Sequence, residues 1–281
     1  MLETRVILVD GASDATATRL TQALALQLEA DDRPVHLPMR REKGHPLRRD
    51  YAPAAYASAE TFMEALVLQW QNFAIRASTE PTPWLSAGGW LEAPRALLAA
   101  GVLDTDAAVD LAVRLFEALE PLAPALVYLV DVDLNPTGDA VGDAAFARLD
   151  SHRTLLNATR LDADELLAEA LAFLAVPVRS IVVDEDLAAH LAGRYGAGQA
   201  PGVEVEVERG GEGLLLSGLP DALGPAPWPL LPATDGRFLV AGLDLELRAD
   251  LDGSGRPTGL LARTSEPALS GLPEFLVRAS D

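Results

Sequence analysis

Apolar segments alternate with amphipathic ones along the first two thirds of the chain. Residues 4–9 are largely apolar and β-branched, which is typical of a parallel strand covered on both faces. Residues 15–28 follow with Leu20, Leu24 and Leu28 at four-residue spacing, and this spacing predicts an amphipathic helix. The alternation continues to residue 183 and predicts an α/β fold, a parallel sheet flanked by helices on both faces.

The remaining elements of this region follow from the same pattern. Further strands are predicted at residues 34–38, 83–89, 124–130 and 178–183. Further helices are predicted at residues 94–100, 105–119, 140–156 and 162–175. A long helix also begins near Ser58, which is a suitable N-cap. Its apolar stripe consists of Phe62, Leu66, Trp70 and Phe73.

The pattern changes after Arg194. Residues 193–202 are rich in glycine and alanine and contain one proline, a composition typical of a linker. Short alternating segments separated by Gly, Pro and Asp turns follow at residues 203–207, 213–216, 237–240, 243–247 and 259–264. We therefore expect two domains, an α/β domain over residues 1–193 and a small antiparallel β domain over residues 203–281.

A glycine-containing turn joins the first predicted strand to the first helix. Counted from Gly11, the spacing matches the P-loop, G-x-x-x-x-G-K-[ST], whose backbone N–H groups wrap nucleotide phosphates at a helix N-terminus. Thr16, Ala17 and Thr18 stand at the positions of the second glycine, the lysine and the hydroxyl ligand. The layout of the motif is present, but the lysine that contacts the β- and γ-phosphates is absent.

Residues 1–193 resemble a group of bacterial P-loop kinase-like proteins of the nucleoside-triphosphate hydrolase superfamily. The resemblance rests on the strand, loop and helix at residues 5–28, on His45-Pro46 followed by the Ser58–Phe73 helix with its Trp70, and on the apolar run that leads from Pro121 to Asp131. Residues 231–238 and 245–259 resemble a small β domain found beside various enzyme domains.

Carried over by position, the resemblance implies a site for ATP and Mg²⁺, with Thr18 as a magnesium ligand. The segment that would hold the phosphates comprises Gly11, Ser13, Asp14, Thr16, Ala17, Thr18 and Arg19. Ala17 supplies no charge for phosphoryl transfer, and Thr16 adds a Cβ where the backbone must approach phosphate. Asp14 and Asp10 add negative charge. We therefore expect phosphate binding weakened by several kcal/mol.

A second departure from the kinase-like pattern lies after the third predicted strand. Such kinases commonly carry an acidic residue there, which positions magnesium or the acceptor hydroxyl. Here Ser86, Gly88 and Gly89 occupy the region, and Glu92 could substitute if the strand runs later. No catalytic residue can be assigned, and the two losses together predict a degenerate phosphate-binding loop.

The chain carries a net charge of −20, and this disfavours binding to nucleic acids, which depends on Lys and Arg contacts to phosphates. No run of apolar residues is long enough for a membrane span, and the early first strand leaves no room for a signal peptide. The absence of cysteine excludes disulfides and thiolate chemistry. These features predict a cytoplasmic protein that does not bind membranes.

Three other groups of residues are candidates for chemistry. Basic residues after the second strand could bind an anion or balance nearby acid in a solvated loop: Arg40, Arg41, Lys43, Arg48 and Arg49. Four aspartates could hold a divalent cation or form a helix cap and a polar loop: Asp131, Asp133, Asp139 and Asp143. The segment Asp250–Gly255 imitates the start of a calcium loop, but Leu261 stands where a glutamate is needed, so we expect a turn. The four histidines share no metal-ligand spacing, and no metal site is predicted.

Three functions fit these observations. The first is a catalytically impaired kinase-like protein, a pseudoenzyme, that binds a protein partner or a small anionic ligand through the retained cleft. The second is an ATP-dependent phosphotransferase for a small molecule in which Arg19, Arg40 or Arg41 replaces the loop lysine. The third is a structural role without a pocket at the strand ends. A homo-oligomer is also considered, because Trp84, Trp90 and Trp228 lie in Pro- and Gly-rich segments suited either to surface contacts or to core packing.

Overall fold

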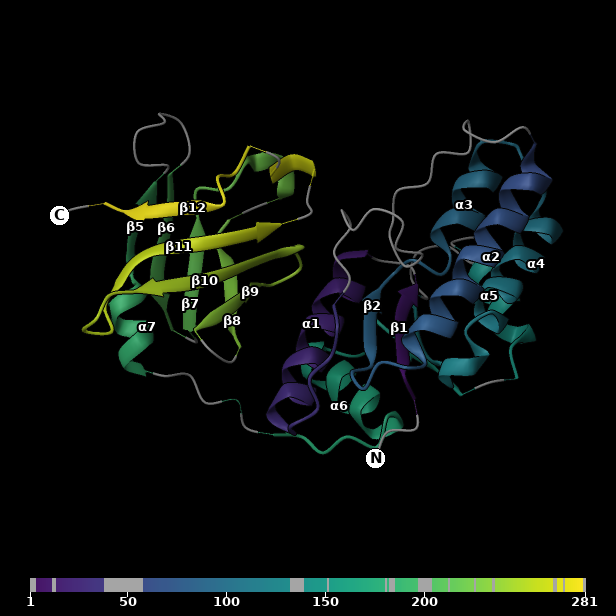
Figure 1. Cartoon of the computed structure of the whole chain (residues 1–281), viewed down its shortest axis with the longest axis horizontal. Helices are drawn as coiled ribbons and strands as arrows, with labels where there is room; N and C mark the ends of the chain where they lie inside the picture. Colours follow the sequence, from purple (N-terminus) through teal and green to yellow (C-terminus); the bar gives the residue numbers. More distant parts are fainter. Residues whose placement is uncertain are drawn as a thin grey trace. The chain divides into compact units, whose positions relative to one another are not determined.

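The computed structural model separates the chain into two compact units, Met1–Arg179 and Ser180–Asp281. Figure 1 shows an α/β unit followed by a β-barrel unit. The division falls earlier in the chain than the linker composition at residues 193–202 suggests, because α7 and the first barrel strand belong to the second unit. The described residues are 4–11, 14–37, 58–131, 139–150, 152–179, 181, 185–196, 204–211, 213–224, 226–233, 236–264, 267–269 and 271–279.

The α/β unit contains a four-stranded parallel sheet. Its strands are β1 (Val6–Gly11), β2 (Trp84–Ala87), β3 (Ala125–Val130) and β4 (Arg153–Asn157), in the order β2-β1-β3-β4. Its helical elements are α1 (Asp14–Ala30), α2 (Ala59–Ala77), α3 (Glu92–Ala99), α4 (Thr105–Glu117), the 3₁₀ turn η2 (Glu120–Leu122), α5 (Ala140–Arg148) and α6 (Ala163–Phe173).

Helices cover both faces of this sheet, as the sequence pattern predicts (Figure 1). Alternate residues of β1 point to opposite faces, so Val6 and Leu8 pack against α2 to α5 while Ile7 and Val9 pack against α1 and α6. The predicted apolar stripes of α1 and α2 are buried in these two cores, and Ser58 caps α2 by accepting a hydrogen bond from the Thr61 N–H. The α/β class is therefore confirmed.

Three sequence-based element predictions are wrong. The helix predicted at residues 140–156 ends at Arg148, and β4 follows, because pairing with β3 satisfies backbone groups of residues 153–157. Val178, Arg179 and Ile181 belong to no strand, and the backbone N–H and carbonyl of Arg179 are instead hydrogen-bonded to the Gln27 side chain of α1. The strand predicted at residues 34–38 is reduced to one parallel bridge between His36 and Trp84.

The second unit is a closed antiparallel barrel of eight strands. They are β5 (Gly193–Gly196), β6 (Glu204–Gly210), β7 (Gly213–Ser217), β8 (Trp228–Pro232), β9 (Arg237–Val240), β10 (Leu245–Leu251), β11 (Pro257–Thr264) and β12 (Phe275–Arg278), with β12 paired to β5. Helix α7 (Glu185–Leu191) precedes the barrel, and the 3₁₀ turns are η3 (Asp221–Leu223) and η4 (Pro267–Leu269). The predicted antiparallel β domain is confirmed, with β5, β8 and β12 in addition to the predicted strands.

Two of the tryptophans considered for surface contacts are core residues. Trp90 is fully buried and its indole N–H donates to the Ala112 carbonyl at 2.7 Å, while Trp228 is buried inside the barrel. Trp84 is half-buried and contacts Phe73 edge to face. These side chains therefore give no argument for self-association. Among the described helices, none is both long and apolar enough to cross a bilayer.

Candidate functional site

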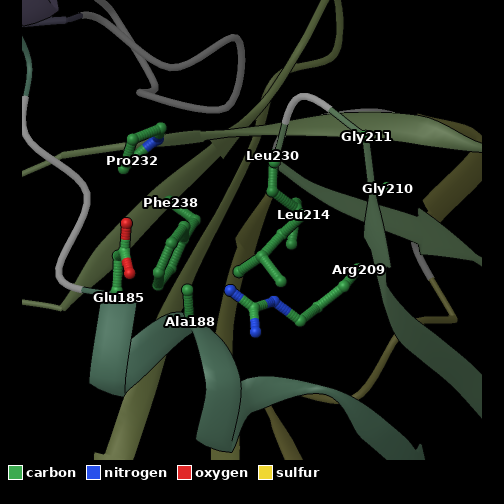
Figure 2. Close-up of a pocket in the computed structure, with 10 residues that line it drawn as sticks. Glu185, Ala188, Arg209, Gly210, Gly211, Leu214, Leu230, Pro232 and Phe238 are labelled. Carbon is green, nitrogen blue, oxygen red and sulfur yellow. The ribbon is translucent and has the colours of Figure 1, made fainter.

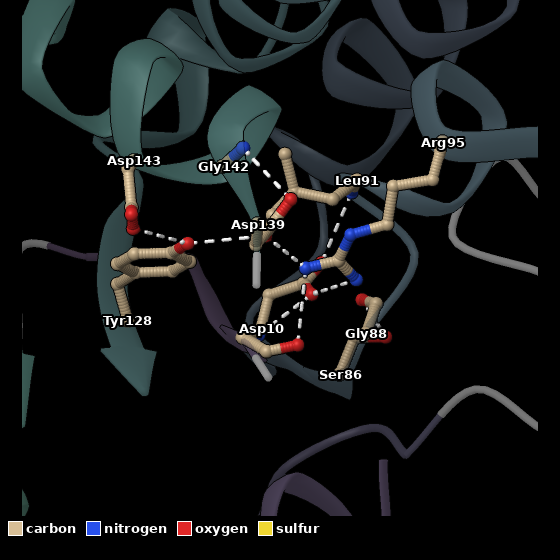
Figure 3. A network of polar contacts seen from close by, with 10 residues as sticks. Asp10, Ser86, Gly88, Leu91, Arg95, Tyr128, Asp139, Gly142 and Asp143 are labelled. Atoms are coloured by element: carbon tan, nitrogen blue, oxygen red, sulfur yellow. Dashed lines mark hydrogen bonds and ion pairs between the residues drawn. The ribbon is translucent and has the colours of Figure 1, made fainter. Parts of the chain in front are cut away.

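The strand order of the α/β unit reverses once, and we call the region outside the carboxyl ends of the strands at this reversal the crevice. The chain passes from β1 to β2 on one side and then crosses to β3 on the other, so the order reverses between β1 and β3. Ligands of parallel α/β folds bind outside the strand ends at such a reversal. Here a polar network lies at this position, formed by Asp10, Arg95, Tyr128, Asp139 and Asp143 (Figure 3).

Asp10 lies at the buried end of β1, with only 2% of its surface exposed. Its carboxylate accepts hydrogen bonds from the Gly11 N–H at 2.8 Å and the Leu91 N–H at 3.0 Å, and it pairs with Arg95 at 3.5 Å. Burial raises the pKa of the Asp10 carboxyl, while Arg95 and the two backbone donors act in the opposite direction. Asp10 is thus a structural acceptor that joins β1 to the start of α3.

Arg95 comes from the first half of α3 and reaches across the crevice. Its Nη2 group donates to the Gly11 carbonyl at 3.0 Å and to the Asp139 carboxylate, while Nη1 faces Asp10. Burial alone would lower the pKa of Arg95, but the hydrogen bond to Asp139 and the charges of Asp10 and Asp139 raise it above its ordinary value. The guanidinium is therefore firmly charged and already engaged by three acceptors.

The Tyr128 hydroxyl lies between the carboxylates of Asp139 and Asp143. It contacts Asp139 Oδ2 at 3.1 Å and Asp143 Oδ1 at 3.0 Å. Asp139 also caps α5 by accepting from the Gly142 N–H at 3.0 Å, and a Cβ at Gly142 would lie 2.1 Å from Asp139 Oδ2. Burial and the two carboxylates hold the pKa of Tyr128 well above its ordinary value. The phenol is consequently a permanent donor.

Replacing Tyr128 with phenylalanine should lower the free energy of unfolding by about 2 kcal/mol at neutral pH, because Asp139 and Asp143 lose the partly buried hydroxyl whose single proton they share. The raised pKa gives the difference a pH dependence. The folded protein retains the phenolic proton above the unfolded value of about 10, so wild-type stability falls as pH rises through that range. The Tyr128→Phe variant should show a shallower fall. Urea denaturation at a series of alkaline pH values measures this, and parallel curves would contradict it.

The segment matched to the P-loop has a different local structure from that motif. Helix α1 begins at Asp14, so most of the stretch from Gly11 to Thr18 is helix rather than an open loop. Ala17 and Thr18 are buried, and Ala17 packs in the core beneath the sheet together with Leu20. Phosphate binding by this segment stays a prediction.

Other predicted site residues are not brought to the crevice or cannot be placed. Arg19 is exposed on α1, and Ser13 and the side chain of Asp14 lie outside the described residues. The same holds for the whole basic cluster, Arg40, Arg41, Lys43, Arg48 and Arg49. β2 ends at Ala87 and Glu92 starts α3, so Glu92 does not take the strand-end position.

Of the four aspartates considered as ligands for a divalent cation, two belong to the polar network of the crevice, and one of these two also caps a helix. Asp139 is the N-cap of α5 and Asp143 contacts Tyr128, whereas Asp131 accepts a hydrogen bond from Thr159 and Asp133 is outside the described residues. Within the described part of the chain, no group of three or more histidine, aspartate or glutamate side chains is placed to hold a metal ion. The calcium-like segment is a turn between β10 and β11, in which Asp252 accepts from the backbone of Ser254 and Arg256.

Sequence reasoning missed Arg95 and Tyr128 as site residues. Arg95 lies 85 positions from Asp10 in the sequence, and no sequence motif connects the two residues. One sequence signal was available, since Tyr128 is a polar residue in an apolar strand that ends at the expected site. The assembled crevice holds three carboxyl groups and one guanidinium, which is a poor charge balance for a phosphate chain.

The fold and this crevice define a doubly wound α/β unit with an additional β-barrel. The chain matches no known family model, and no curated protein shows detectable similarity to it.

Proposed function

We propose that this chain is a catalytically impaired, P-loop kinase-like protein that acts by binding a protein partner or a small anionic ligand. One observation carries the proposal: the chain's own ion-pair network lies at the strand ends beside Gly11, the start of the segment matched to the P-loop. The Arg95 guanidinium donates hydrogen bonds to Gly11, Asp10 and Asp139. A phosphate that bound to this guanidinium would have to displace the two carboxylates.

The helix at residues 14–18 supports the same proposal. A P-loop needs an open turn whose backbone N–H groups surround phosphate, followed by a lysine at the helix start. Here the helix starts at Asp14, and the residue at the lysine position, Ala17, is a buried core residue. The net charge of −20 further disfavours polyanionic ligands and attracts basic partners.

The alternative function, an active phosphotransferase, has one contact in its favour. Arg95 Nη2 lies 3.0 Å from the Gly11 carbonyl, so an arginine does reach the start of the segment, although none of the arginines predicted for this role does so among the described residues. In that case Arg95 would exchange Asp139 for a phosphate when nucleotide binds. The two functions therefore make opposite predictions for ATP.

Calorimetric titration of the full chain with ATP·Mg²⁺ tests the proposal. We expect no saturable binding up to millimolar nucleotide, for the wild type and for the Arg95→Gln variant alike. The phosphotransferase alternative predicts micromolar binding by the wild type and a loss of about tenfold or more in Arg95→Gln, since one charge-assisted contact is worth at least 1.4 kcal/mol. Micromolar binding by the wild type would overturn our proposal. Lysine at position 17 is not a suitable probe, because Ala17 is buried in the core.

A further inference from the structure

The β-barrel unit contains a pocket that the proposed function of the α/β unit does not use. It has a volume of about 230 Å³ and lies where the β6–β7 hairpin turns, beside α7 (Figure 2). Its lining includes the side chains of Glu185, Ala188, Arg209, Leu214, Leu230 and Phe238. All of them belong to the barrel unit, so the pocket is complete within that unit.

Arg209 occupies a position in β6 where an apolar residue is expected. Val205 and Val207 are buried in the barrel core, and the two-residue period of a strand puts Arg209 on the same side of β6, where its side chain is exposed near the end of the strand. Figure 2 shows its guanidinium pointing into the pocket. Within the described part of the chain, this guanidinium has neither an ion pair nor a hydrogen bond. An unpaired guanidinium at the wall of a pocket is suited to a carboxylate.

Glu185 supplies a second charge on another wall of the same pocket. It is the first residue of α7, and its carboxylate likewise has no ion-pair or hydrogen-bonding partner among the described residues. A purely anionic ligand would be repelled by Glu185, and a purely cationic ligand would be repelled by Arg209. A ligand that carries both charges can pair with both residues.

The remaining walls of the pocket are apolar, so they indicate that the ligand also carries an apolar group. Leu214, Leu230 and Phe238 are largely buried and line the pocket with Ala188, so they form an apolar part of its wall (Figure 2). The volume exceeds the roughly 150 Å³ that accommodates benzene in an engineered cavity. It is below the range of about 300 Å³ and more that is typical of drug-sized ligands. One small apolar group and a compact polar head would fit.

We propose that the barrel binds a free α-amino acid with an apolar side chain, with its carboxylate on Arg209 and its ammonium group on Glu185. The apolar side chain then lies against Leu214, Leu230 and Phe238. This assignment rests on the barrel alone and holds whether or not the α/β unit binds nucleotide.

Calorimetric titration with L-phenylalanine tests the proposal, with 3-phenylpropionate and phenethylamine as probes that lack the ammonium and the carboxylate group. We expect saturable binding of phenylalanine and at least about tenfold weaker binding of each analogue, because each loses one charge-assisted contact. In the amide spectrum of ¹⁵N-labelled protein, the signals of Gly210, Gly211 and Gly213, which line the pocket, should shift on phenylalanine addition.

Two variants and two matched controls locate the site. Arg209→Gln and Glu185→Gln should each weaken phenylalanine binding by about tenfold or more. Arg248→Gln and Glu208→Gln change exposed charges of the barrel that do not line the pocket, and they should leave the affinity within about twofold of wild type. The proposal is overturned if phenylalanine does not bind, if 3-phenylpropionate binds equally well, or if Arg209→Gln binds like the wild type.

Discussion

Replacing Arg95 with methionine is expected to lower the free energy of unfolding of the α/β unit by about 3 kcal/mol, the lower end of the cost of removing one partner of a buried ion pair, because the Arg95 side chain is itself 32% exposed. Methionine retains much of the aliphatic bulk but leaves Asp10 and Asp139 without their shared cation. Asp10 is 2% exposed and cannot recover the loss through hydration. The loss should grow as pH rises through the range in which Asp10 ionises, because burial raises the pKa of this carboxyl and its protonated form needs no cation.

Chemical denaturation followed by tryptophan fluorescence measures this effect, since three of the four tryptophans, Trp70, Trp84 and Trp90, lie in the α/β unit, and only Trp228 lies in the barrel. Arg114→Met on α4 is the matched control, because Arg114 is exposed, and its effect should stay within about 0.5 kcal/mol. Adding Asp10→Asn to Arg95→Met should cost less than the sum of the two single changes, because the double variant removes the unpaired charge as well. Equal losses for Arg95→Met and Arg114→Met would contradict the role of the network.

Replacing Gly11 with alanine is expected to destabilise the α/β unit by about 3 kcal/mol or more, or to prevent its folding, through a clash and backbone strain together. A Cβ at this position would lie 2.0 Å from the Leu129 carbonyl oxygen in the paired strand β3. The glycine also has a φ of +150°, which an L side chain rarely adopts. Neither β1 nor β3 can withdraw, because both lie at the centre of the sheet.

Gly101→Ala is the control that separates the two contributions. Gly101 belongs to the same unit and has a φ of +67°, but a Cβ there would meet nothing within 4 Å. Its substitution should cost about 1 to 2 kcal/mol from backbone strain alone. Denaturation midpoints of the two variants measure the difference, and a Gly11→Ala variant as stable as Gly101→Ala would show that β3 moves away from the added methyl group.

Helix α1 was predictable from the sequence, whereas strand β4 was not. Leu20, Leu24 and Leu28 reveal α1 by spacing alone, because burial of one helix face imposes its period on neighbouring residues. Residues 140–156 show the limit, since a short apolar run after a helix fits either a longer helix or a strand. Residues 153–157 form a strand rather than a longer helix because β3 supplies hydrogen-bonding partners to their backbone.

The sequence by itself determined the two-part organisation, most helices of the α/β unit, and the expectation that the strand ends would be the place to look for a site. Only the tertiary structure decided what occupies that place. Asp10, Arg95, Tyr128 and Asp139 come from four separate segments, and ion pairs between distant segments impose no spacing on the chain. The periodicity of apolar residues in the sequence shows which face of a helix or strand is buried. The partners of a buried charge depend on how the helices and strands pack against one another.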